Sequence, residues 1–127
     1  MKQLKQTPSQ TVGPYFAYGI TPKQYQFQHG ELATNILYKN QPYGERITIT
    51  GRVLDGDGNA VNDALIELRQ DSTPAGFGRM GTGTESDYSF HFSTLKPKSD
   101  GESAPHINVT VLMRGLLNHV FTRIYFS

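Results

Sequence analysis

The segment A-P-H-I-N-V-T-V (104–111) contains residue types that could bind a metal ion. In an extended strand, His106 and Asn108 would point to the same face, about 6–7 Å apart, because successive side chains alternate. A His-x-His pair at this spacing could supply two ligands to a transition metal, but asparagine is a poor ligand for such ions. The segment is therefore a metal site, a metal site that has been lost, or an ordinary strand.

Two glycine-rich motifs also resemble binding sites. The letters G-F-G-R-M-G (76–81) match a dinucleotide-binding fingerprint, which works only between a strand and a helix. No helical pattern follows them, so we predict a glycine-rich loop. The letters D-G-D-G-N (55–59) open like a calcium loop, but Ala60 and Ile66 stand where that loop needs glycine and glutamate. We predict a turn there.

Composition excludes several classes of function. The chain of 127 residues has no cysteine, which rules out disulfides, thiolate metal sites and a cysteine nucleophile. A formal charge of +1 gives no reason to expect nucleic acid or an anionic membrane as a partner. The start, M-K-Q-L-K-Q-T-P, lacks the apolar run of a secretory signal, and no stretch is long enough to span a membrane. We expect a soluble, cytoplasmic protein.

The elements that must position these residues are strands. Alternating apolar and polar residues predict five of them, at 46–54, 64–69, 88–92, 107–113 and 119–126. High glycine and proline contents, with no convincing helix between the strands, favour an all-β fold. We predict an antiparallel β-sandwich, with a barrel as the other architecture that fits.

The chain divides into an arm and a core. Residues 1–45 lack periodicity and contain four prolines, so we expect a long irregular N-terminal arm that wraps a partner chain. Residues 46–127 form the predicted sandwich core. Because an apolar strand stands directly before Ser127, we expect this core to be incomplete at its C-terminus. The joins near Asp71–Ser72 and Lys98–Asp100 are short for loops of such a core, which leaves open whether residues are missing there too.

Several stretches together resemble one family. They are T-P-S-Q-T-V-G-P-Y (7–15), G-R-V-L-D-G-D-G-N-A-V-N-D-A-L-I-E-L (51–68), G-F-G-R (76–79), T-L-K-P (94–97) and A-P-H-I-N-V-T-V-L-M-R-G-L-L-N-H-V-F-T-R-I-Y-F (104–126). This set is similar to the intradiol ring-cleaving dioxygenases and covers the chain apart from residues 20–45. Many β-sandwiches share the middle stretch, whereas the last stretch and the Gly-Pro-Tyr arm are specific.

The resemblance implies that the metal site has been lost. Catalytic chains of the family hold non-haem Fe(III) with two tyrosines and two histidines, the latter as His-x-His on this strand. His106 matches the first histidine, and Asn108 replaces the second. No tyrosine occurs in residues 71–76 or 96–105, where the family has its tyrosine ligands. The resemblance thus implies an alpha chain without iron, paired with a beta chain that binds the Fe(III).

The resemblance also implies a role at the partner's substrate pocket. The expected substrate-binding residues are Thr11, Gly13, Pro14, Tyr15 and Arg114, and none of them is expected to be catalytic. Arginine suits the carboxylate of protocatechuate (3,4-dihydroxybenzoate), since its planar fork of donors matches that group. The implied reaction inserts both atoms of O2 between the hydroxyl-bearing ring carbons and gives 3-carboxy-cis,cis-muconate.

Other interpretations stay open. His106 and Arg114 could lie up to about 26 Å apart along one strand, so they do not easily serve a single small pocket. Arg114 could instead be a solvated arginine at a strand end. The whole chain could be a transthyretin-like binding module without catalytic function, which would bind its ligand without a second chain. A single-chain catechol dioxygenase that lacks its metal loops is the third alternative, against which Asn108 argues.

Overall fold

The computed structural model describes residues 2–41, 43–72, 74–99 and 101–127 of the chain. Its helices are the short α1 (Phe16–Ile20) and the 3-10 helix η1 (Pro22–Tyr25). Its strands are β1 (Arg46–Arg52), β2 (Leu65–Gln70), β3 (Gly76–Gly81), β4 (Ser89–Leu95), β5 (His106–Leu112) and β6 (Val120–Tyr125). Within these ranges, no helix is long and apolar enough to cross a lipid bilayer.

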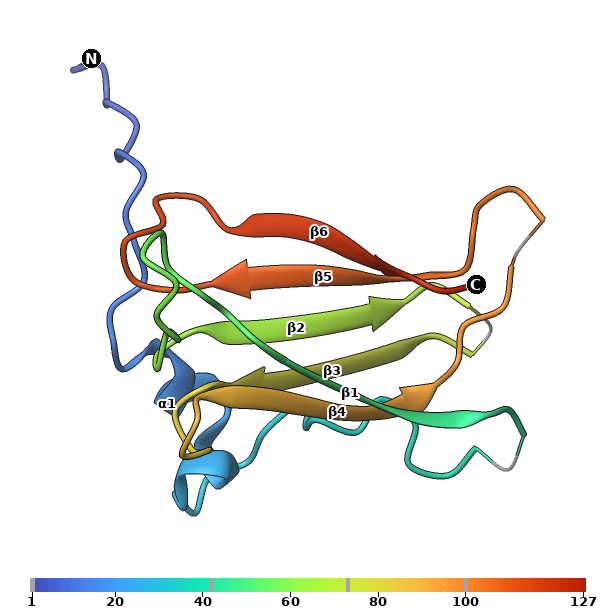
Figure 1. The fold of residues 1–127 in the computed structure, drawn as a ribbon. Helices are drawn as coiled ribbons and strands as arrows, with labels where there is room; N and C mark the ends of the chain where they lie inside the picture. Colours follow the sequence, from blue (N-terminus) through green and yellow to red (C-terminus); the bar gives the residue numbers. More distant parts are fainter. Residues whose placement is uncertain (1, 42, 73, 100) are drawn as a thin grey trace.

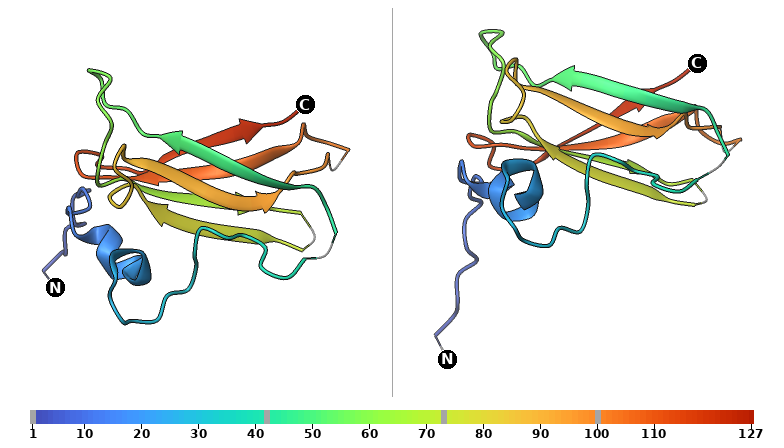
Figure 2. Two further views of the ribbon diagram at one scale, coloured as in Figure 1. Left: turned by 60° about the horizontal axis from the view of Figure 1, so that its bottom comes forward. Right: turned by 90° about the horizontal axis from the view of Figure 1, so that it is seen from below.

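The strands form two antiparallel sheets that stack on each other (Figures 1 and 2). One sheet has the order β3-β2-β5-β6, and the other pairs β1 with β4. This arrangement confirms the predicted all-β sandwich and the five strands expected from alternation. In the larger sheet, β5 lies between β2 and β6, so Asn108 faces Arg69 on one side and Arg123 on the other.

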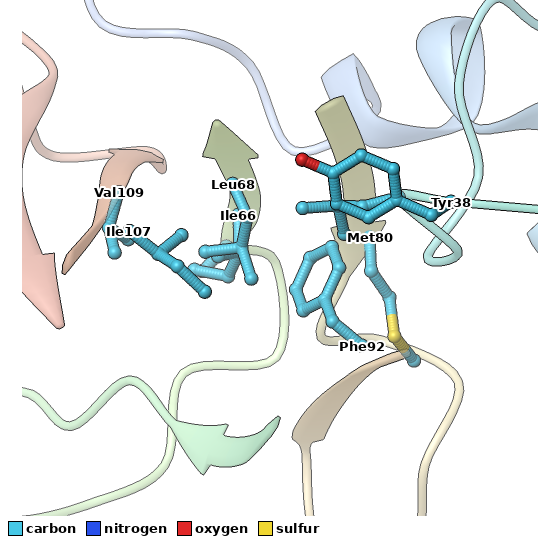
Figure 3. Close-up of a cluster of buried hydrophobic side chains, with 9 residues drawn as sticks. Tyr38, Ile66, Leu68, Met80, Phe92, Ile107 and Val109 are labelled. Atoms are coloured by element: carbon cyan, nitrogen blue, oxygen red, sulfur yellow. The ribbon is translucent and has the colours of Figure 1, made fainter. Parts of the chain in front are cut away.

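The core lies between the sheets and follows from the alternation along the strands. Ile107 and Val109 of β5 are buried, whereas His106 and Asn108, which alternate with them along the strand, are only half-buried. Phe92 of β4 is fully buried opposite them. Figure 3 shows the labelled members of this cluster, which are Tyr38, Ile66, Leu68, Met80, Phe92, Ile107 and Val109. The two candidate metal-binding positions therefore lie on the outer face of the larger sheet.

The glycine-rich segment 76–81 is strand β3, so the prediction of a loop there was wrong. A Cβ atom on Gly76 would lie 2.5 Å from Tyr38 Cζ, and one on Gly78 would lie 2.5 Å from Leu37 Cδ1. Glycine is thus needed because another segment of the chain packs directly on the strand backbone. Strand β3 leads into a turn and then β4, so the dinucleotide-binding interpretation does not apply.

Part of the predicted arm belongs to the core of this same chain. Leu37 and Tyr38 are only 8% and 5% exposed. The backbone N–H of Arg79 donates to Thr34 O at 2.8 Å, and that of Leu37 donates to Ser93 O at 3.0 Å. The arm that leaves the sandwich is therefore shorter than residues 1–45. That this arm wraps a partner chain stays a prediction.

The connection after β1 is a turn, as predicted from D-G-D-G-N. The carboxylate of Asp55 accepts hydrogen bonds from the backbone N–H groups of Asp57 at 2.9 Å and Asn59 at 2.8 Å. The bond from Asn59 is the main reason that the pKa of Asp55 lies below its usual value. Gly58 adopts a φ of +83°, which favours glycine. The Asp55 carboxylate thus closes the turn through these two hydrogen bonds.

Candidate functional site

Arg114 occupies a tight turn directly after β5. The backbone N–H of Leu116 donates to Met113 O at 3.3 Å, which closes the turn around Arg114 and Gly115. Gly115 has a φ of +90°, a conformation that glycine adopts without the steric cost of a side chain. The Arg114 side chain is 59% exposed. The turn thus presents a guanidinium to solvent at one end of the sandwich.

The N-terminal arm is fastened to this turn by Thr11. The backbone N–H of Gly115 donates to Thr11 Oγ1 at 2.8 Å, across 104 positions of sequence. The same hydroxyl donates to Met113 O at 3.3 Å. Figure 1 shows the arm passing the loop between β5 and β6 at this end of the molecule. The structure therefore brings Thr11 to the turn that carries Arg114, and the family resemblance implied that these two residues share one pocket.

The other predicted substrate-binding residues continue from the same point. The N–H of Phe16 donates to Gly13 O at 3.1 Å, so the arm turns at Gly13 and Pro14 and enters α1. Tyr15 is 77% exposed, and its ring centroid lies 5.7 Å from that of Tyr18. An exposed aromatic surface therefore follows the fastened part of the arm. That Gly13, Pro14 and Tyr15 touch a substrate stays a prediction.

Sequence reasoning missed the residue that contacts Arg114. Asp63 Oδ2 lies 2.9 Å from Arg114 Nε, and the Asp63 side chain is only 11% exposed. No N–H among the described residues is aligned with this oxygen well enough for a hydrogen bond, so the contact is one of charge. Burial raises the pKa of nearby Tyr25, and the charges of Tyr18 and Asp63 raise it further. The letters N-D-A (62–64) before β2 carry no local pattern that indicates this contact.

The two candidate metal-binding positions make other contacts. His106 Nδ1 lies 2.8 Å from the carbonyl oxygen of Ala104. Asn108 Nδ2 donates to Asp71 Oδ2 at 2.9 Å, and Arg123 Nε donates to Asn108 Oδ1 at 3.2 Å. Asp71 Oδ1 in turn lies 2.9 Å from Arg69 Nε. Asn108 is thus the centre of a chain of hydrogen bonds and an ion pair across β2, β5 and β6.

These residues do not fit an iron ion. Within the part of the chain that the structure describes, no three His, Cys, Asp or Glu residues are grouped to hold a metal. The guanidinium of Arg123 beside Asn108 would repel a cation, and an amide is a poor ligand for iron. The hollow on this face, of about 590 Å³, is bordered by Arg69 as well as Arg123. The outer face thus suits polar contacts and not metal ligation.

The chain is similar in sequence to several known proteins. No family model matches the chain. The whole chain is 46% identical to 73% of the protocatechuate 3,4-dioxygenase alpha chain of Burkholderia cepacia. It is 32% identical to the alpha chain of the same name from Pseudomonas putida, over 98% of this chain and 71% of that one. The beta chain from Burkholderia cepacia is 34% identical over 53% of this chain and 35% of that one.

Two solved structures share the fold. The dioxygenase domain of a dioxygenase–carbohydrate-binding fusion from Streptomyces sp. SirexAA-E matches with a TM-score of 0.64 at 22% identity, over 95% of this chain and 75% of that one. Hydroxyquinol 1,2-dioxygenase from Pseudomonas putida DLL-E4 matches with a TM-score of 0.57 at 19% identity, over 98% and 50%. At such identities, these likenesses establish the fold alone.

Proposed function

The chain belongs to the protocatechuate 3,4-dioxygenase alpha chains, a branch of the intradiol ring-cleaving dioxygenases, and we propose that it acts as the iron-free half of a two-chain enzyme. In this proposal a beta chain binds the Fe(III), and the present chain borders the substrate pocket around it. The substrates are protocatechuate and O2, and the product is 3-carboxy-cis,cis-muconate. Relatives named as alpha and beta chains of one dioxygenase support the pairing.

The outer face of the larger sheet supports the absence of iron from this chain. Asn108 stands where the catalytic chains have their second histidine, and its amide is engaged by Asp71 and Arg123. A metal ion here would have to displace both contacts and face an arginine. Iron bound by the partner would supply the activation of the catechol toward O2. The present chain then contributes binding and orientation.

The observation that carries the proposal is the bond between Thr11 and the turn of Arg114. Residues near the two ends of the chain meet because Gly115 N–H donates to Thr11 Oγ1 at 2.8 Å. The bond holds the turn that carries the exposed Arg114 to the part of the arm just before the Gly-Pro-Tyr segment. Protocatechuate carries a carboxylate, and burying that charge costs several kcal/mol unless a partner pairs with it. Arg114 can supply that partner through a charge-assisted pair.

The Gly-Pro-Tyr segment can form the wall of the same pocket. Gly13 has no atom within 4 Å of the position that a Cβ would occupy, so the backbone there is open on that side. Pro14 restricts the backbone through its fixed φ. Tyr15 offers a flat ring and a hydroxyl group, a combination common where a surface meets an aromatic ligand. These features would hold the aromatic ring of a substrate against the partner's site.

Reconstitution with a beta chain tests the division of roles. We expect the purified chain alone to bind no stoichiometric iron and to leave protocatechuate unchanged, because Asn108 and its neighbours do not form a metal site. Adding a beta chain, such as that of Burkholderia cepacia, should restore ring cleavage, with iron content set by the beta chain. Iron is measured by elemental analysis and cleavage by product absorbance.

Two outcomes would contradict this proposal. A stoichiometric ferric site in the lone chain would mean that the chain holds its own metal. Tight binding of a catecholic ligand by the lone chain, with no effect of a beta chain on turnover, would favour the transthyretin-like binding module instead.

A further inference from the structure

Asp63, which lies shortly before β2, contacts Arg114 in the turn after β5. Its Oδ2 atom lies 2.9 Å from Arg114 Nε, and Asp63 is mostly buried whereas Arg114 is largely exposed. Among the described residues, no other carboxylate lies within ion-pair distance of Arg114. A guanidinium has five N–H donors, so a contact at Nε leaves the two terminal nitrogens for another anion. The arginine can therefore contact the carboxylate of Asp63 and the carboxylate of a ligand at the same time.

The segment that carries Asp63 is held rigidly by Thr82. Thr82 is fully buried, and its hydroxyl donates to Val61 O at 2.7 Å. The same oxygen accepts from Ala64 N–H at 3.1 Å, and the N–H of Thr82 donates to Ala64 O at 2.9 Å. Asp63 lies between these two anchored residues. Its carboxylate is thus a fixed point against which a long side chain can be aligned.

We propose that Asp63 is a positioning residue, which holds the Arg114 guanidinium by its Nε edge so that the terminal nitrogens bind the carboxylate of a catecholic acid. The inference rests on the proposed function of Arg114. Because Arg114 is largely exposed, solvent screens its attraction to Asp63, so the contribution of Asp63 is orientation more than net attraction. Thr11 fixes the backbone of the same turn, so the side chain and the backbone of Arg114 are each held.

A double-mutant cycle in the reconstituted two-chain enzyme tests this role. Asp63→Asn should lower kcat/KM for protocatechuate by about three- to thirty-fold, which lies within the range of coupling between residues in contact. The loss should appear mainly in KM. Catechol, which has no carboxylate, should be affected by less than about two-fold, and so should protocatechuate when Asp63→Asn is added to Arg114→Ala.

A matched control is Asp57→Asn, since Asp57 is an exposed aspartate in the turn after β1 and its carboxylate makes no ion pair among the described residues. It should leave both substrates unchanged. If Asp63→Asn disturbs assembly, Asp63→Glu gives a second comparison, because it keeps the charge but moves it by one methylene group. A selective loss on protocatechuate is expected there too.

The outcomes separate this inference from the proposed function. Equal losses on both substrates in Arg114→Ala would overturn the substrate-binding role of Arg114, and the positioning role with it. A loss in Arg114→Ala that is selective for protocatechuate, without one in Asp63→Asn, would overturn the positioning role alone. A lower KM for protocatechuate in Asp63→Asn would also overturn it, because Asp63 would then compete with the substrate for Arg114.

Discussion

At the scale of single residues, two positions carry the proposed division of roles between this chain and its partner. Asn108 stands where the resemblance to the catalytic chains places a metal-binding histidine, and it joins Asp71 and Arg123 in a chain of polar contacts. Arg114 keeps an exposed charge on a turn that the N-terminal arm holds in place. In the proposed function, the first position explains why the chain itself binds no iron. The second is the proposed contribution to its partner.

Thr11 provides a test at this scale. Thr11→Val keeps the shape of the side chain but removes the acceptor of the Gly115 N–H, a hydrogen bond typically worth about 0.5–1.5 kcal/mol. We expect kcat/KM for protocatechuate in the two-chain enzyme to fall by about two- to twelve-fold, the equivalent of that energy. Thr11→Ser retains the hydroxyl and serves as the control, with near-normal turnover. Normal turnover in Thr11→Val would show that the bond does not matter for the pocket.

Thr11 and Arg114 could be predicted as substrate-binding residues only from the family resemblance. Neither residue type is distinctive by itself, and the two lie at opposite ends of the chain. Asp63 was missed because its contact depends on how the segment before β2 meets the turn after β5. Such a contact joins segments that are distant in sequence, and no local spacing encodes it.

At the scale of elements, the close approach of segment 33–38 to β3 explains why this strand is rich in glycine. Gly76 and Gly78 have no side chains on the inner face, so Tyr38 and Leu37 can pack against the strand. The apolar residues of this irregular segment take the place that larger strand residues would fill. An irregular segment of the arm thus completes the core.

Gly78→Ala tests this packing. A Cβ at this position would meet Leu37 Cδ1 at 2.5 Å and Thr34 O at 3.1 Å, so something must move. We expect a loss of about 1–3 kcal/mol in the free energy of unfolding, typical of an overpacked core. Gly56→Ala is the control, since a Cβ there meets no atom within 4 Å, and it should change stability by less than about 0.5 kcal/mol. Urea unfolding followed by circular dichroism measures both, and equal stabilities would contradict the packing argument.

The strands that alternate clearly were predictable, and β3 was not. Strands such as β5 place Ile107 and Val109 inward with polar residues between them, so periodicity identifies them. The letters G-F-G-R-M-G contain three glycines, which are depleted in strands. Their assignment to a strand depends on Leu37 and Tyr38, about forty positions earlier. The core contribution of 33–38 was missed for the same reason.

At the scale of the whole molecule, the chain has a packed sandwich and an extended N-terminal segment. Most side chains of residues 2–15 are exposed, and Thr11 provides the side-chain hydrogen bonds of this segment to the turn after β5. Figure 2 shows the segment leaving the body of the sandwich before α1. A segment of this kind costs conformational entropy to order, so we infer that a partner chain stabilises it.

Deletion of residues 1–16 tests the role of this segment. The sandwich should remain folded, because the deletion removes none of the buried residues that the structure describes and loses contacts only near α1 and at the turn after β5. Assembly with a beta chain and turnover of protocatechuate should both decrease. Assembly is measured by analytical ultracentrifugation, with the full-length chain as the reference. Full activity after the deletion would contradict the proposed role.

In the proposed two-chain enzyme, this chain contributes Arg114 to a substrate pocket whose iron is bound by the partner chain. The most direct measurement compares protocatechuate and catechol in the two-chain enzyme carrying Arg114→Ala. Loss of a charge-assisted contact typically costs about 1.5–3 kcal/mol, a decrease in kcat/KM of roughly ten- to over a hundred-fold. We expect that decrease on protocatechuate, a much smaller one on catechol, unchanged iron content, and partial recovery in Arg114→Lys. Equal losses on both substrates would contradict this role of Arg114, because the residue would then stabilise the assembly and not bind the substrate.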